Sequence, residues 1–208
     1  MKIIAPVTPK KFTITRGRLQ EYEDVDTRKR YWSISEGLFV LDPEAFKGVD
    51  PHVMAAAQTR GTNLHVLFGL RLLAEIGLAE KPARPAGIIG NYFDAIEKFI
   101  YEKQPRALKV EQPSCNDSLH LAGTPDTQCL IGLDNWIIDL KTGDKRAVHS
   151  SQLHAQKKLD GYEKARRLGS LYINRKGDYK LVEHTTDVID WGGFMGALAV
   201  LQWRKQRG

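Results

Sequence analysis

The chain has 208 residues, of which 31 are Lys or Arg and 25 are Asp or Glu, so its formal net charge is +6. This length fits one compact domain rather than two. With 42% hydrophobic and 27% charged residues, the composition excludes wholesale disorder. The excess of basic residues permits nucleic-acid binding but does not establish it.

Cysteine is too scarce for a disulfide scaffold, a four-cysteine zinc site or an iron–sulfur cluster with four cysteine ligands. Only Cys115 and Cys129 occur. The apolar start of the chain is broken by Pro6 and is too short for a signal peptide, and no apolar run is long enough to span a bilayer. We therefore expect a cytoplasmic protein with no membrane segment and no iron–sulfur cluster.

The first half of the chain is predicted to be mainly helical. Residues 1–30 are polar and of mixed charge, which predicts an N-terminal arm or irregular segment with an edge strand at 11–15, ahead of a single domain at 31–208. Asp42-Pro43 and Asp50-Pro51 each combine an N-cap with a first-turn proline, so each predicts a helix start. Gly61 is predicted to interrupt the second of these helices, which resumes up to Gly77. Asn91 is predicted to cap a helix that ends before residue 105.

The second half alternates strands and helices. Strands are predicted at 107–111, 119–123, 127–131 and 136–140, with a turn at 132–135 between the last two. A helix at 150–168, strands at 171–174 and 179–182, and a final helix at 190–206 follow. This order predicts an α/β fold in which a central mixed β-sheet is flanked by helices.

The chemistry is concentrated around one predicted hairpin. Asp126 stands at the start of one strand, and Asp139 and Lys141 stand near the end of the next. Residues two apart on a strand share a face, and the hairpin brings Asp126 close to them. Two neighbouring carboxylates favour a hard divalent cation such as Mg²⁺ or Mn²⁺, and a lysine beside it can hold an attacking water or neutralise a phosphate oxygen. The pattern predicts metal-assisted phosphodiester hydrolysis.

The Asp-x-Lys spacing by itself also arises by chance. A second copy, Asp178-Tyr179-Lys180, follows a turn glycine and is interpreted as a solvated strand edge. Asp139 and Lys141 allow the same interpretation, a surface ion pair. However, Asp139 directly follows the apolar run at 136–138, and a charge so close to a core usually has a function.

Five sequence elements follow one another between residues 60 and 175: Arg60-Gly61-x-x-x-His65, Glu111, Gly123-Thr124-Pro125-Asp126, Ile138-Asp139-Leu140-Lys141-Thr142-Gly143 and Gln152. Together they resemble the PD-(D/E)XK nuclease superfamily, in particular its RecB-like exonuclease branch, which is common in bacteriophages. The resemblance implies a restriction-endonuclease-like core.

The resemblance also implies roles for the matching residues. Asp126 and Asp139 correspond to the metal-binding carboxylates of the family, and Lys141 to its catalytic lysine. His65 corresponds to a helix histidine that completes the metal site, and Glu111 to an additional acidic ligand. Judged without the resemblance, His65 is a core or boundary histidine and Glu111 a solvent-exposed charge at a strand end.

Gln152 matches the start of a Gln-x-x-x-Tyr element in the resembled family, and this implies a supporting role. Here the sequence departs from the family, because position 156 is Gln and the nearest tyrosine is Tyr162. The contact that the family's tyrosine makes near the lysine is therefore not predicted for this chain.

Basic residues cluster after the lysine motif, on the helix predicted at 150–168. They are either a solvated face or contacts to a DNA backbone, which would make binding salt-dependent and independent of sequence. The residues are Lys157, Lys158, Lys164, Arg166 and Arg167.

From these observations we expect a Mg²⁺-dependent deoxyribonuclease, with Mn²⁺ as a substitute, acting as an exonuclease in phage or bacterial recombination or replication. DNA is the expected partner, with a phage recombination or replication protein and self-association as further options. Two alternatives stay open: a structure-specific or restriction-type endonuclease at the same site, and a DNA-binding or assembly module without turnover. Neither RNA as substrate nor the cleavage polarity is decided by the sequence.

Overall fold

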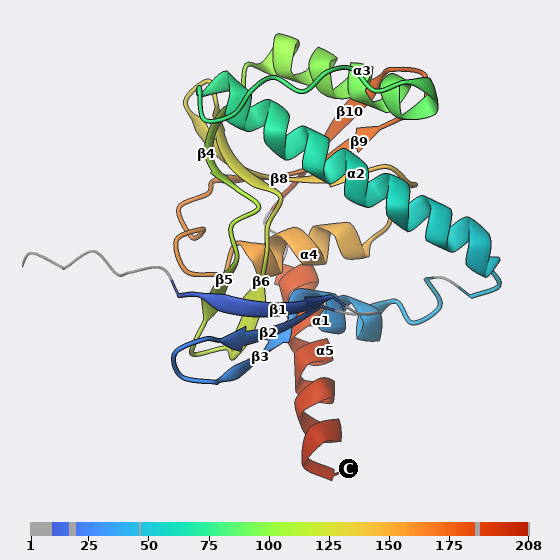
Figure 1. Cartoon of the computed structure of the whole chain (residues 1–208). Helices are drawn as coiled ribbons and strands as arrows, with labels where there is room; N and C mark the ends of the chain where they lie inside the picture. The colour runs from blue at the N-terminus through green and yellow to red at the C-terminus, as the bar shows by residue number, and fades with distance from the viewer. Residues whose placement is uncertain (1–9, 17–19, 46, 186–187, 208) are drawn as a thin grey trace, which may run out of the picture.

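The computed structural model describes residues 10–16, 20–45, 47–185 and 188–207. These residues form two five-stranded sheets and five helices (Figure 1). The central sheet has the order β10-β9-β8-β7-β4, and the N-terminal sheet has the order β1-β2-β3-β6-β5. The α/β class is confirmed, although the strands divide between two sheets rather than one.

The central sheet is mixed. β4, β7 and β8 pair antiparallel, β8 and β9 pair parallel, and β9 and β10 pair antiparallel. Since parallel neighbours need a crossover, helix α4 connects β8 to β9. The strands are β4 (Arg106–Val110), β7 (Thr127–Ile131), β8 (Asp134–Lys141), β9 (Arg167–Ile173) and β10 (Tyr179–His184).

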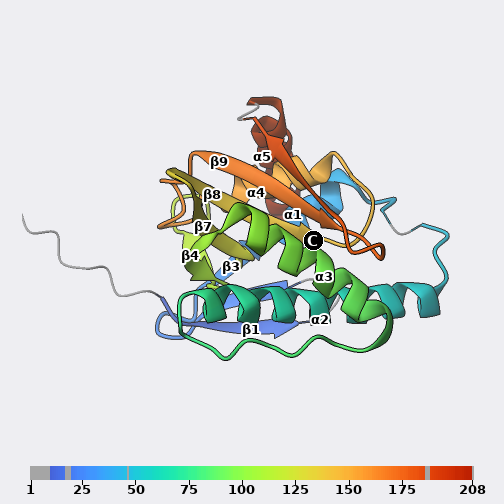
Figure 2. The same ribbon diagram turned by 90° about the horizontal axis from the view of Figure 1, so that it is seen from above.

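Helices cover both faces of the central sheet (Figure 2). One face carries α2 and α3, and the other carries α4, against which α1 and α5 pack. The helices are α1 (Ile34–Leu41), α2 (Pro51–Glu75), α3 (Gly87–Lys103), α4 (Val148–Gln156) and α5 (Val188–Arg207).

Side-chain alternation along β8 decides which face carries charge. Ile138 and Leu140 pack into the core beneath α2 and α3, whereas Ile137 packs with Leu153 of α4 on the opposite side. Because successive strand residues point to opposite faces, Asp139 and Lys141 lie on the same side as Ile137, toward α4. The strand therefore presents two charges to the helix that follows it.

The predicted N-terminal arm is wrong for the part that the structure describes. Residues 10–30 contribute to the N-terminal sheet, in which β1 is an edge strand, as predicted. Tyr22 and Tyr31 are buried there beside Cys115. The polar composition hid these strands because one face of the sheet remains solvated. The strands are β1 (Phe12–Arg16), β2 (Gln20–Asp24), β3 (Arg30–Ser33), β5 (Ser114–Asn116) and β6 (Leu121–Gly123); residues 1–9 lie outside the described part.

Helix α2 runs without interruption through Gly61, so the predicted break is wrong. Its predicted start is confirmed, because the Asp50 side chain accepts hydrogen bonds from the backbone N–H groups of His52 and Val53. The buried residues of α2, among them Leu64, Phe68 and Leu72, all follow Gly61. The helix extends from this packed part back to its cap at Asp50, because one glycine lowers helix propensity by only about 1 kcal/mol.

Two other predicted helix starts are also wrong. Asp42 ends α1 instead of starting a helix, and residues 43–45 form a turn. Helix α1 begins instead at Ser33, which forms a capping box with Glu36. Asn91 lies inside α3, which begins four residues earlier at Gly87.

The continuous α2 predicts that Gly61→Ala stabilises the metal-free protein. Apart from the adjacent helix backbone, no atom of the described residues lies within 4 Å of the position that a Cβ at Gly61 would occupy, so the methyl group fits without strain. We expect the free energy of unfolding to rise by about 0.5–1 kcal/mol, because alanine loses less backbone entropy in a helix. Urea unfolding in EDTA measures this change.

Gly69→Ala on the same helix is the control, since a Cβ there would lie 3.1 Å from Cγ1 of Val110. Packing strain there should cancel the gain. A stabilisation at Gly69 equal to that at Gly61 would contradict the structure.

Asp117 connects the N-terminal strands to the turn after β5. It accepts hydrogen bonds from Nζ of Lys10 at 2.6 Å, the Tyr31 hydroxyl at 2.5 Å and Nζ of Lys29 at 3.1 Å. These donors, Lys10 foremost, hold the pKa of Asp117 well below its ordinary value of 3.8. The carboxylate thus stabilises the folded protein above pH 4, and this contribution is lost as the pH falls through the folded-state pKa.

We expect Asp117→Asn to lower the free energy of unfolding by about 0.5–1 kcal/mol at pH 7, a modest effect because this side chain is 52% exposed. The difference in the free energy of unfolding between this variant and wild type should decrease steadily as the pH falls below 4. Urea unfolding at pH 7, 4 and 3 tests this, with Asp144→Asn as a control. Asp144 is exposed and has no ion pair with any residue that the structure describes. A difference that stays constant down to pH 3 would be inconsistent with an ionised Asp117.

Candidate active site

The β7–β8 hairpin sets Asp126 opposite Asp139. Thr127, the first residue of β7, pairs with Ile138 in the antiparallel ladder, so Asp126, just before β7, and Asp139 lie next to each other beyond this last pair. The backbone N–H of Leu140 donates to Oδ2 of Asp126 at 2.6 Å and fixes this carboxylate. Only 8% of Asp126 and 1% of Asp139 is exposed. The sequence-based expectation that a hairpin brings these two residues together is confirmed.

Lys141 joins Asp139 on the α4 side of the sheet. Its ammonium forms an ion pair with Oδ2 of Asp139 and donates to Oε1 of Gln152 at 2.9 Å. Gln152 in turn donates from Nε2 to Oδ1 of Asp139 at 2.8 Å. The glutamine therefore bridges the carboxylate and the lysine and holds both in place, which is the supporting position predicted for it.

Gln156 is a site residue that the sequence reasoning missed. It lies one turn after Gln152 on α4, is 2% exposed, and its Nε2 reaches Oδ1 of Asp139 at 3.4 Å. Tyr162 does not reach the lysine; its hydroxyl donates to the backbone carbonyl of Gln112. The spacing of four residues between the two glutamines, which places them on one helix face, is the signal that could have identified Gln156.

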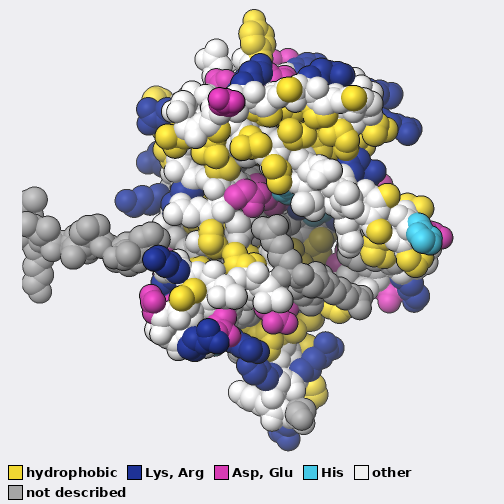
Figure 3. Space-filling view, viewed as in Figure 1, with side chains coloured by type: hydrophobic (Ala, Val, Ile, Leu, Met, Phe, Trp, Pro, Cys, Tyr) yellow, Lys and Arg dark blue, Asp and Glu magenta, His cyan; other side chains and the backbone are white. Residues whose placement is uncertain are grey.

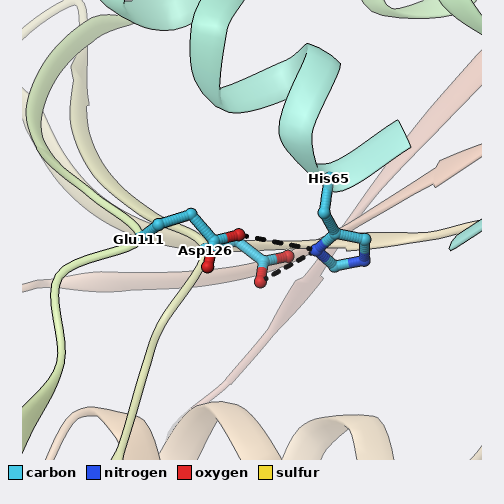
Figure 4. A group of neighbouring side chains, drawn as sticks. All are labelled: His65, Glu111 and Asp126. Carbon is cyan, nitrogen blue, oxygen red and sulfur yellow. Dashed lines mark ion pairs between the residues drawn. The ribbon is translucent and has the colours of Figure 1, made fainter. Parts of the chain in front are cut away.

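A second group, beside the Asp139–Lys141 ion pair, consists of His65, Glu111 and Asp126 (Figure 4). Nδ1 of His65 lies 3.1 Å from Oδ1 of Asp126 and 3.8 Å from Oε1 of Glu111. One ligand atom from each of the three residues lies within 4.8 Å of the others. Of the four metal ligands predicted, three thus form one cluster, while Asp139 is held by Lys141.

Backbone geometry turns Glu111 into this cluster. The residue follows the end of β4 with a φ of +46°, a left-handed conformation that is uncommon outside glycine. Its N–H donates to the carbonyl of Asp126 at 2.9 Å, which extends the β4–β7 ladder by one step. Such strain persists where surrounding structure enforces it and is frequent at functional sites.

The charges of the cluster are strongly coupled. Burial disfavours protonation of His65, but the carboxylates of Asp126 and Glu111 outweigh it and raise the imidazole pKa to about 10. Burial raises the pKa of Asp126, and Asp139 and Glu111 act in the same direction. Burial also opposes the charge on Lys141, yet Asp139 and Asp126 raise its pKa. In the metal-free protein Lys141 is therefore an ammonium at neutral pH and His65 an imidazolium.

These residues share one open cleft of about 550 Å³. Figure 3 shows acidic side chains beside histidine at the middle of this face, between the α2–α3 layer and the N-terminal sheet. Gln20 and Thr124 contribute further polar groups and are joined through the Tyr22 hydroxyl, at 2.8 and 3.0 Å. The residues that line the cleft are Gln20, Gly61, Thr62, His65, Val66, Glu111, Thr124, Asp126, Asp139, Lys141 and Gln152.

The basic residues predicted to contact DNA do not lie on a helix face beside the cleft. Helix α4 ends at Gln156, so the prediction of a helix to residue 168 is wrong; the chain turns there to bury Leu159 and Tyr162. Of these basic residues, Lys158 lies over the ring of Trp191 at 5.1 Å, and Arg167 pairs with an acidic residue on each neighbouring strand. None of Lys157, Lys158, Lys164, Arg166 and Arg167 is among the residues that line the cleft.

Comparison with known proteins does not assign this site. No protein-family model matches the chain, and no curated protein matches it significantly. Among the described residues, no helix has both the length and the apolar character that crossing a membrane requires. A functional assignment therefore depends on the geometry and chemistry of the cleft itself.

Proposed function

We propose that this chain is a deoxyribonuclease that requires Mg²⁺ or Mn²⁺, with a restriction-endonuclease-like core, as its sequence resemblance to PD-(D/E)XK nucleases implies. One observation carries the proposal: Asp126 and Asp139 lie opposite each other on a buried hairpin, and an ammonium group, Lys141, lies beside them in an open cleft. Buried carboxylates placed together in this way are costly for stability and are typical of functional sites.

The donor atoms fit a divalent cation. Two carboxylate oxygens and one imidazole nitrogen converge from Glu111, Asp126 and His65. Oxygen ligands suit Mg²⁺ and Mn²⁺, and the nitrogen ligand shifts the preference toward Mn²⁺. A cation is also needed electrostatically, because the three carboxylates of the cleft would otherwise repel a phosphodiester. His65 must lose its proton to become a ligand.

A bound metal ion and Lys141 would have different roles in the reaction. A bound metal ion would polarise the phosphodiester and lower the pKa of a water molecule. Lys141, positively charged and fixed by Asp139 and Gln152, stabilises negative charge that develops on the phosphate oxygens. Hydrolysis forms one bond from phosphorus to the water oxygen and breaks one bond from phosphorus to a sugar oxygen. The proton released by the water balances the one taken up by the leaving oxygen.

The resemblance favours an exonuclease over an endonuclease. Comparing linear DNA with covalently closed circular DNA as substrates distinguishes the two activities, because an exonuclease requires a DNA end. Purified protein should release nucleotides from linear DNA in Mg²⁺ or Mn²⁺, release none in EDTA, and leave covalently closed circular DNA intact. Cleavage of circles would establish an endonuclease instead. Metal-independent binding to DNA without cleavage in any metal would reject the nuclease proposal and favour a binding module.

A further inference from the structure

The active-site cleft continues on one side into a longer groove. Past His65 and Lys141 it opens into a hollow lined by Thr142 and Gly143, and these two residues also line a third hollow of about 550 Å³. We call this third hollow the distal groove, with Arg60, Tyr92, Tyr172, Arg175, Tyr179 and Lys180 among its lining residues. The intermediate hollow shares lining residues with the cleft and with the distal groove, so the three hollows adjoin one another along the surface.

The distal groove is predominantly basic. Arg60, Arg175 and Lys180 line it together with a single acidic residue, Asp144. No residue within the described ranges forms an ion pair with any of these three cations. Uncompensated positive charge inside a groove attracts an anionic ligand.

The three cations come from three different elements: Arg60 from α2, Arg175 from the β9–β10 turn and Lys180 from β10. The Arg60 guanidinium lies 5.8 Å from the ring centre of Tyr92, and its Nε is buried with no acceptor among the described residues. Arg175 belongs to the β9–β10 turn, which lies beside the start of α3 in Figure 2. Nδ2 of Asn91 on that helix donates to the Arg175 carbonyl at 3.1 Å and anchors the turn.

The rest of the cleft wall, as far as the structure describes it, carries no such positive charge. Among the described residues there, Gln20, Thr62, Val66 and Thr124 line the wall, and none is basic. Among the described residues, the basic side chains beside the acidic centre therefore lie on the distal-groove side. A ligand with several regularly spaced negative charges would be held on that side of the reacting phosphate.

We propose that the distal groove binds the phosphate backbone of an unpaired polynucleotide strand whose scissile phosphate lies in the acidic cleft. This inference rests on the proposed nuclease function and names its substrate as a single strand. The partly exposed rings of Tyr172 and Tyr179 also line the groove, and aromatic rings beside basic residues are typical of sites that stack unpaired bases. Phosphate contacts from Arg60, Arg175 and Lys180 would make binding sensitive to salt.

The test compares a groove variant, Arg60→Ala/Arg175→Ala/Lys180→Ala, with a control of equal charge loss outside the groove, Lys11→Ala/Lys103→Ala/Arg106→Ala. Fluorescence anisotropy measures binding of a 12-nucleotide single strand, and of a blunt duplex of the same sequence, in EDTA over a series of salt concentrations. Kinetics in Mn²⁺ give kcat/KM for the same strand relative to a dinucleotide. The double variant Arg175→Ala/Lys180→Ala, which changes only exposed residues, covers the case in which the triple variant does not fold.

We expect the groove variant to bind the strand at least tenfold more weakly. The ratio of kcat/KM for the strand to kcat/KM for the dinucleotide should fall at least tenfold. The slope of the logarithm of the binding constant against the logarithm of the salt concentration should decrease in magnitude by about two to three. The double variant should show about a threefold loss and the control less than twofold. Equal losses in groove and control variants, or a loss confined to blunt duplex DNA, would overturn the inference. If wild type cleaves nothing, the proposed function fails, and the binding comparison still decides the groove.

Discussion

Replacing either buried aspartate should abolish activity while the fold is retained. Asp126→Asn and Asp139→Asn keep the side-chain shape but remove the negative charge, so each is expected to lower kcat/KM on linear DNA by about 10³-fold or more. Asp126 should also lose metal binding, because it is one of the three clustered ligands. Nucleotide release in Mn²⁺ and metal titration by calorimetry measure the two effects.

The chain supplies its own control for this experiment. Asp178 belongs to the second Asp-x-Lys triplet, where it forms an exposed ion pair with Lys98 at 2.7 Å. Asp178→Asn should leave nucleotide release within twofold of wild type. If Asp139→Asn and Asp178→Asn were equally active, the hairpin would not be the catalytic centre.

Removing the ammonium group should slow the reaction and destabilise the metal-free protein. Lys141→Met is expected to lower kcat by about 10²–10³-fold, because a fixed positive charge at the developing oxyanion is lost. Asp139 would then be a buried carboxylate without its cation, at a cost of about 3 kcal/mol in the free energy of unfolding. A saturating divalent metal at the His65, Glu111 and Asp126 cluster should recover part of this loss, since Asp126 lies next to Asp139 and the ion adds positive charge near that carboxylate.

Lys98→Met is the matched substitution at an exposed Lys–Asp pair, which should leave both the free energy of unfolding and kcat close to the wild-type values. Urea unfolding in EDTA and in Mn²⁺, together with single-turnover rates, separates stability from catalysis. Full activity of Lys141→Met would show that this lysine is only a structural partner of Asp139.

Both predictions follow from the different roles of the two groups of residues in the site. The first group, His65, Glu111 and Asp126, has the donor geometry of a metal site. The second group consists of Asp139, Lys141 and Gln152, which are linked to one another by hydrogen bonds and an ion pair. The hairpin joins the groups, so a substitution in one group should alter kcat and metal affinity to different extents.

The sequence alone determined the hairpin and its charged residues. The turn predicted at 132–135 is shorter in the structure, where Asp134 already pairs with Ile131, so the register was not predicted. The glycine-containing turn nevertheless predicts that the two strands pair, and alternation along β8 places Asp139 and Lys141 on one face. Both depend on neighbours within about ten residues, a range over which turn chemistry and strand periodicity are sufficient. The start of α2 at Asp50 was predictable for the same reason.

Only the tertiary structure decided what surrounds the hairpin. The part of α2 that follows Gly61 packs in the core and carries His65 to Asp126, and the helix extends back from it through Gly61. Residues 20–24 form a strand because β1 and β3 pair with them, although their sequence is polar. α4 stops at Gln156 so that the following turns can fill the core. Long-range packing free energy outweighs local propensity in each case, and a single sequence does not reveal which distant segments will meet.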